Sequence, residues 1–225
     1  MKMNINYLEN NIILSDDYIF AIEVENKNYF YRIINELNLI SNGDEISNID
    51  FFDRDGKEIN LSNKINLIID YFNIDFNSKK ILNSLYKSIK DNIDEEIKLK
   101  LNSNYKKFCE LISKTLTGYD FPLVINEEFD LDNIFKLLKI SINDKNNLLD
   151  NLLLLIYIEN LFKVNQLLVL VNLKSYLSNN ELVEFYKYSI YNEIKVILID
   201  SQCYGATIKN EKKLIIDSNL DEFLL

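Results

Sequence analysis

Apolar residues recur along the chain with two different periods, and these periods predict alternating strands and helices. Short apolar runs between polar residues predict strands, because a strand inside a sheet needs only about four to eight apolar residues. Apolar residues spaced three and four apart predict helices that bury one face. The expected strands cover residues 11–14, 18–24, 65–72, 167–172, 195–200 and 212–218, and the expected helices cover residues 26–40, 131–139, 146–163 and 179–192.

Local signals add detail to this order of elements. Asp55-Gly56, inside residues 48–59, predicts the turn of a hairpin. Ser178 and Glu181 have the S-x-x-E spacing of a capping box. The all-apolar strands that flank the following helix should be parallel neighbours. The helix of residues 146–163 is apolar nearly all round, so we expect it to be buried against the sheet.

The segment from Asn77 to about Leu116 has a different pattern, helical throughout. Asn77 or Ser78 can cap a first helix, and the acidic residues 94–96 suit the start of a second. A long helical segment between strands indicates an arm inserted into an α/β body.

Charge is unevenly distributed along the 225 residues. The net charge of −10 argues against a polyanionic partner. Residues 78–114 nevertheless hold nine lysines against five acidic residues, while the rest of the chain holds 16 basic against 30 acidic residues. On a helix, Lys79, Lys80, Lys87 and Lys90 fall within an arc of about 100°. Such a face can bind phosphates without reading sequence, although a merely solvated helix face is the alternative.

The sequence lacks the residues that several kinds of catalytic and metal-binding sites require. The chain has no histidine, which excludes Ser-His-Asp and Cys-His catalysis and a His-ligated zinc site. Its two cysteines, Cys109 and Cys203, show no metal-binding spacing. The sequence has neither a leader peptide nor an apolar run long enough for a membrane span, which predicts a cytoplasmic protein with no membrane partner.

Three expected strands end at or near Asp70, Asn172 and Asp200, where open α/β sheets bind ligands. A carboxylate at such a strand end can hold a metal ion beside a nucleotide. The chain has no GxxxxGK[ST] loop to cradle a triphosphate, and a polar residue also simply ends an apolar strand. A diverged P-loop-type nucleotide hydrolase or kinase therefore stays open as an alternative function.

An acidic loop offers candidate metal ligands. Its members are Glu127, Glu128, Asp130 and Asp132. Calcium takes several carboxylate oxygens, so this loop can be a calcium site, although it lacks the EF-hand spacing. A charged helix start is the alternative.

Three stretches, in this order, resemble one family. They are "FFDRDGKEI" at 51–59, "YFNIDFNSKKILNSLYKSI" at 71–89 and "LLVLVNLKSYLSNNELVEFYKYSIYNEIKVILID" at 167–200. Together they resemble the Csn-two family, the adaptation protein of type II-A CRISPR systems, in its shorter form. The resemblance implies an α/β fold: a P-loop-ATPase-like head of residues 1–74 and 147–225, with a mostly parallel sheet and a degenerate phosphate loop. An inserted helical leg of residues 75–146 completes the expected fold, and no enzymatic activity is implied.

The resemblance also implies a function. Members form a homotetrameric ring, stabilised by calcium, that binds the ends of double-stranded DNA. They support acquisition of new spacers together with the CRISPR integrase pair and the RNA-guided nuclease. The expected DNA contacts are Lys79, Lys80, Lys87 and Lys90, followed by Lys98, Lys100, Lys106 and Lys107, and the approximate calcium ligands are Glu127, Glu128, Asp130 and Asp132. Some relatives carry several lysines before the strand that begins here at Leu167, where this chain has only Lys163. An acidic scaffold that binds only other proteins is the third hypothesis.

Overall fold

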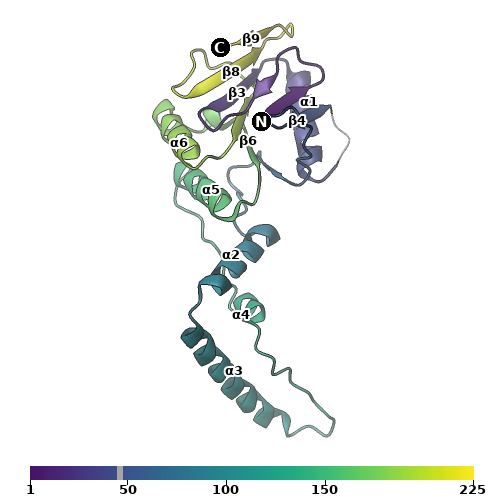
Figure 1. Cartoon of the computed structure of the whole chain (residues 1–225), viewed down its shortest axis with the longest axis vertical. Helices are drawn as coiled ribbons and strands as arrows, with labels where there is room; N and C mark the ends of the chain where they lie inside the picture. Colours follow the sequence, from purple (N-terminus) through teal and green to yellow (C-terminus); the bar gives the residue numbers. More distant parts are fainter. Residues whose placement is uncertain (45–47) are drawn as a thin grey trace. The chain divides into compact units, whose positions relative to one another are not determined.

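The structure, a computed structural model, describes residues 1–44 and 48–225. The chain divides into two compact units, which we call the head unit (residues 1–76 and 143–225) and the leg unit (residues 77–142). The expected division at residues 75 and 146 falls close to these bounds. Figure 1 shows a mixed α/β head unit and an all-helical leg unit.

The elements alternate along the chain much as the apolar pattern predicts. In the head unit they are β1 (Lys2–Ile5), β2 (Ile12–Ile13), β3 (Ile19–Val24), α1 (Lys27–Ser41), β4 (Ile49–Phe52), β5 (Ile65–Ile68), α5 (Leu148–Phe162), β6 (Leu167–Val171), the short 3-10 helix η1 (Leu173–Ser175), α6 (Asn179–Tyr191), β7 (Val196–Asp200), β8 (Glu211–Ile216) and β9 (Glu222–Leu224). In the leg unit they are α2 (Lys79–Asn92), α3 (Glu95–Leu116) and α4 (Leu131–Leu137).

The main sheet of the head unit has six strands in the order β5-β6-β7-β3-β8-β9. All neighbours are parallel except β9, which runs antiparallel to β8. The prediction that residues 167–172 and 195–200 form parallel neighbours is confirmed, since Leu168 pairs with Val196. Between them, Ser178 and Glu181 form the expected capping box at the start of α6.

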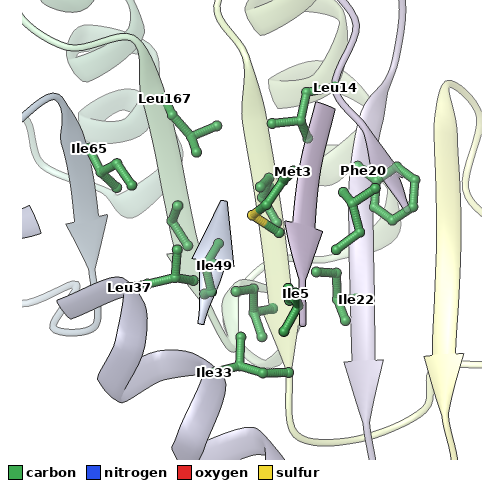
Figure 2. Close-up of a cluster of buried hydrophobic side chains, with 14 of the residues drawn as sticks. Met3, Ile5, Leu14, Phe20, Ile22, Ile33, Leu37, Ile49, Ile65 and Leu167 are labelled. Atoms are coloured by element: carbon green, nitrogen blue, oxygen red, sulfur yellow. The ribbon is translucent and has the colours of Figure 1, made fainter. Parts of the chain in front are cut away.

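One face of this sheet builds the main hydrophobic core. Phe20 and Ile22 of β3 point to this face, where Ile33 and Leu37 of α1 pack against them. The second, three-stranded sheet, ordered β2-β1-β4, covers the same face with side chains such as Met3. Figure 2 shows these side chains meeting in one cluster. The core is therefore made by segments from both ends of the chain.

The opposite face of the main sheet meets α5 and α6. Phe185 and Tyr186 of α6 are fully buried there, and Leu152 of α5 is buried as well. The sequence predicts that α5, apolar nearly all round, is buried against the sheet; its buried side fits that prediction, while Tyr157 and Leu161 are half exposed. An apolar composition fixes the buried stripe of a helix but not the coverage of its remaining surface.

Three strands differ from the expectation. β1 and β9 are not predicted, whereas the predicted hairpin of residues 48–59 is confirmed, with its turn at residues 54–56. Its first half, β4, also pairs with β1. Its second half returns beside β4 through a bridge between Phe52 and Glu58 and through backbone hydrogen bonds from Asp53 to Lys57 and from Ile59 to Phe51, at 2.9 and 2.8 Å. β5 ends at Ile68 rather than near residue 72, because the Asp70 carboxylate accepts hydrogen bonds from the amide of Phe72 and from Asn73 and forms a turn.

The leg unit has a small core of its own. Tyr86 of α2 packs against Phe135 of α4, with ring centroids 5.5 Å apart, and Leu131 completes the cluster. The Tyr86 hydroxyl donates a hydrogen bond to the backbone oxygen of Ile140 at 3.0 Å. No helix in the described ranges 1–44 and 48–225 is both long and apolar enough to cross a bilayer.

Candidate functional site

The lysines of α2 are placed by the amphipathic pattern of that helix. Ile81 and Tyr86 are buried, so the helix presents its opposite side to solvent. Lys79, Lys80 and Lys87 lie on that exposed side. Their contact with an anionic partner stays a prediction.

The lysines of α3 fall into two kinds. Lys98 and Lys100 pair with Glu95 and Glu96 of the preceding turn. Lys106 and Lys107 are exposed and make no ion pair with any described residue. Lysines without an acidic partner thus lie in the second half of this helix, while its first turns carry lysine–glutamate ion pairs.

Lys90 is held in a different way. Its ammonium lies 2.6 Å from the Asp132 carboxylate, which joins α2 to the start of α4. This ion pair links an expected DNA contact to an expected calcium ligand. The charge of Lys90 is thus compensated within the leg unit, so it is a weaker candidate for a phosphate contact than Lys87.

The acidic loop does not fit a calcium ion within one chain. Asp132 is engaged by Lys90, and Asp130 caps α4 by accepting a hydrogen bond from the backbone amide of residue 132 at 3.0 Å. Glu127 and Glu128 are exposed. Among residues 1–44 and 48–225, no three acidic or other metal-ligating side chains converge as a metal site. Calcium requires several oxygen ligands at once, which this arrangement does not supply.

The leg unit also exposes an unusual amount of apolar surface. Ile97, Phe108, Leu111 and Ile112 of α3 fall within an arc of about 100° and are all exposed. In the following connection, Val124 is 94% exposed. Other exposed apolar residues of the leg unit are Leu99, Tyr119, Phe121, Leu123, Leu137 and Leu138. Contiguous apolar surface of this kind marks an interaction site in soluble proteins.

At the carboxyl ends of the head strands, the chain leaves no space for a phosphate loop. Only Glu25 and Asn26 connect the central strand β3 to α1. The Asn26 side chain accepts hydrogen bonds from the amides of Asn28 and Tyr29, at 3.1 and 3.2 Å. The amino-terminal amides that would bind a phosphate are thus already occupied.

The three polar strand ends do not converge on a common ligand. Asp70 forms its own turn, and the Asn172 side-chain oxygen accepts two hydrogen bonds from Ser201. Asp200 is completely buried. A polar pocket of about 430 Å³ does exist in the head unit, but it is lined by residues such as Gln166 and Lys195, where β6 and β7 begin. Ligands of open α/β sheets bind at the other end of the strands.

Four buried charges beside Asp200 were not predicted. Lys174 of η1 lies 2.9 Å from Glu23 and 3.0 Å from Glu211. Lys213 lies 2.8 Å from Glu23 and 3.6 Å from Glu211. We call Glu23, Lys174, Glu211 and Lys213 the ion cluster. The sequence contains a signal for one member, because Glu23 is a charged residue within the otherwise apolar strand β3.

Burial and pairing act in opposite directions on the ion cluster. Burial raises the pKa of Glu23, but hydrogen bonds from Lys174 and Lys213 outweigh this, so the pKa lies below its ordinary value. Burial likewise lowers the pKa of Lys174, but Glu23 and Glu211 outweigh it and the net shift is upward. All the cluster's members that show a shift are thus held in their charged forms.

Comparison with known proteins relates this architecture to one family. A model of the CRISPR-associated protein family Cas_Csn2 matches residues 42–220. The fold is similar to the crystal structure of Stu0660 of Streptococcus thermophilus, with a TM-score of 0.65 and 16% identity, over 100% of this chain and 76% of that one. No curated protein matches the chain. Because the family model covers far more than half of the sequence, the chain belongs to the CRISPR-associated Csn2 family, the Csn-two family that its sequence resembles.

Proposed function

We propose that this protein binds the ends of double-stranded DNA without reading sequence and supports spacer acquisition in CRISPR adaptation. The observation that carries the proposal is a set of exposed leg lysines, Lys79, Lys87, Lys106 and Lys107, that make no ion pair with any described residue. They stand out in a chain of net charge −10. Membership of a CRISPR-associated family is consistent with this role.

The head unit would act as a scaffold rather than an enzyme. The strand order β5-β6-β7-β3-β8, with β3 central and followed by a helix, supports a fold related to P-loop ATPases. The connection where a phosphate loop would lie has only two residues, and Asn26 occupies the helix amides there. Two lysines near this end, Lys174 and Lys213, are committed to the ion cluster. These observations argue against the nucleotide hydrolase alternative.

Assembly into a homotetrameric ring would bury the exposed apolar surface of α3. Ile97, Phe108, Leu111 and Ile112 form a stripe that a second copy can cover, and the adjacent lysines would then be brought together with those of other copies. Calcium would act only in such an assembly, where carboxylates of more than one copy can meet, since a single leg unit does not hold it. The CRISPR integrase pair and the RNA-guided nuclease are the proposed protein partners.

Salt dependence of duplex binding tests the DNA proposal. Four substitutions of Lys79, Lys87, Lys106 and Lys107 by Gln should weaken binding to every duplex sequence alike. Each lost phosphate contact lowers the log–log salt slope by about 0.9, so the full set lowers it by up to about 3.6. The matched control replaces four exposed head lysines, Lys57, Lys145, Lys187 and Lys209, by Gln with the same change of net charge.

Equal loss of affinity in both variants would show that only net charge matters and would overturn the leg interface. The mass of the native assembly, measured with calcium and with a chelator, tests the ring separately. A tetramer that dissociates on chelation supports calcium between copies. A monomer under both conditions that ignores DNA would favour the protein-only scaffold.

A further inference from the structure

The ion cluster is electrically balanced and lies beside a buried carboxyl group that is not part of it. Two carboxylates, Glu23 and Glu211, face two ammonium groups, Lys174 and Lys213, and all four side chains are buried. The Tyr186 hydroxyl donates a further hydrogen bond to Glu211 at 2.6 Å. The cluster therefore needs no additional charge for neutrality.

Asp200 is the neighbouring group. It pairs in register with Glu23 across β7 and β3, its exposed fraction is 0%, and no described side chain donates a hydrogen bond to its carboxylate oxygens. Of the described groups, the backbone amide of Lys174 is the one hydrogen-bond donor that favours its charged form. The titratable groups that face it are Glu23, Glu211, Lys174, Tyr186 and Tyr71. Burial raises the pKa of Asp200 to about 7, with Lys174 acting in the opposite direction and the two glutamates adding to the rise.

The chain that follows Asp200 is bonded to members of the ion cluster. We call residues 201–209 the closing loop. The amide of Tyr204 donates to Glu23 at 3.1 Å, and the backbone oxygen of Gly205 accepts from Lys213 at 3.0 Å. The Tyr204 hydroxyl lies 2.7 Å from the Ser175 hydroxyl. Residues 202–207 are otherwise exposed and form neither helix nor strand, so few other contacts retain the loop.

We propose that the closing loop is a lid that stays shut while Asp200 is uncharged and opens when Asp200 ionises. An ionised Asp200 adds a third carboxylate to a cluster with only two ammonium groups, and beyond the backbone amide of Lys174 it has no described donor to satisfy its two oxygens. A buried unpaired charge is costly, and water is the available donor. Water reaches Asp200 when the loop that begins at Ser201 moves away, which gives up the bonds of Tyr204 and Gly205.

The opening makes the head unit sensitive to pH in the range below neutrality, between the ordinary carboxyl pKa of 3.8 and the closed-form pKa of about 7. The carboxyl ends of β3 and β7 and the ion cluster are shielded in the closed form and become hydrated in the open form. Since this is the edge of the sheet at which α/β proteins bind their ligands, the lid controls access to that edge. The device is independent of the leg lysines and of DNA binding.

Amide hydrogen exchange on the full-length protein tests the lid directly. The Tyr204 amide reports closure, and protection is corrected for the intrinsic pH dependence of exchange. Between the ordinary carboxyl pKa of 3.8, expected in the open form, and the pKa of about 7 in the closed form, opening releases a proton and the opening equilibrium should rise tenfold per pH unit. Protection of Tyr204 should therefore fall about tenfold between pH 5 and pH 6 and level off above pH 7. In Asp200→Asn it should stay constant, and Asp55→Asn, an exposed control at a turn, should follow the wild type.

The amide of Val169, in the middle of β6, separates a lid from general unfolding. Unchanged protection at Val169 while Tyr204 loses protection supports a local opening. A parallel loss at both positions, or a pH-independent Tyr204 in the wild type, overturns the proposal, as does a fall in Asp200→Asn equal to that of the wild type. If Asp200→Asn does not fold, Asp200→Leu serves as a second uncharged variant. The comparison of Tyr204 with Val169 in the wild type tests the proposal without any variant.

Discussion

Breaking the ion cluster of the head unit should destabilise the protein strongly, and restoring its charge balance should recover much of the loss. Lys174→Met leaves two buried carboxylates facing one ammonium group, and Glu23→Gln leaves the reverse imbalance. The double variant keeps one carboxylate, Glu211, and one ammonium group, Lys213, which lie 3.6 Å apart. Charge balance, rather than the number of ion pairs, is thus what the comparison measures.

The geometry sets the expected size of the effect. Two unit charges 2.9 Å apart, as in the Lys174–Glu23 pair, attract by about 6 kcal/mol at an effective dielectric constant of about 20. Desolvation offsets part of this attraction, but removing one partner of a buried pair still costs about 3–5 kcal/mol. Each single variant should lose that much, and the double variant should lose clearly less than the sum, with a coupling energy of about 3 kcal/mol.

Urea unfolding at pH 6, where Asp200 keeps its proton, measures the four free energies of the cycle. The control cycle uses Glu96→Gln and Lys100→Met, an exposed pair in α3. Its coupling energy should be about 0.5 kcal/mol, because solvent screens the charges. A coupling energy in the head unit no larger than that of the exposed pair would refute the reasoning, as would strict additivity of the two buried substitutions.

Three further predictions follow from single features. Ser178→Ala removes the capping box of α6 and should lower the free energy of unfolding in urea by about 1 kcal/mol, whereas Ser103→Ala on exposed α3 should not lower it. Phe135→Ala removes the ring that packs on Tyr86 and should cost the leg unit about 3–5 kcal/mol. Hydrogen exchange of the α2 amides should then become faster while the β6 amides stay protected. Equal loss of protection in both elements would contradict this prediction. Because the pKa of Glu23 is lowered on folding, its contribution is full above its ordinary pKa of 4.5 and is lost as pH falls through the folded pKa. The cost of Glu23→Gln should therefore shrink in acid, and a cost independent of pH between 6 and 3 would disprove the assignment.

Periodicity predicts an element well when the pattern of its own residues determines which of its faces is buried. α1, α2 and α6 each carry their apolar residues on one side, and β6 is apolar throughout, so their existence follows from local pattern. β1 shows the same kind of signal, since Met3 and Ile5 alternate with polar residues and are buried. The pairing of β1 with β4 is a long-range choice, and no local pattern predicts it.

The residues of the candidate site likewise divide into those whose exposure the local sequence predicts and those whose partners it does not predict. Exposure of Lys79 and Lys87 follows from the buried face of their own helix, and the sequence predicts it. The pairing of Lys90 with Asp132 joins residues that are 42 positions apart, and the sequence analysis assigned these two residues to different ligands. The acidic loop similarly has the right residue types for calcium, but Asp130 is used for a helix cap and Asp132 for an ion pair, while Glu127 and Glu128 stay exposed.

The ion cluster explains why the head unit can keep the ligand-binding edge of an α/β sheet without a ligand. Glu23 and Asp200 lie next to each other near the carboxyl ends of β3 and β7, where a bound phosphate or metal ion would normally compensate charge. Here Lys174 and Lys213 supply that compensation from within the chain, and the closing loop completes it. A ligand at this edge would have to displace two buried ammonium groups and leave Glu23 and Glu211 unpaired, at a cost of several kcal/mol. The same charges that hold the head unit together therefore oppose nucleotide binding there, so substitutions at Lys174 should affect stability before they affect any contact with DNA.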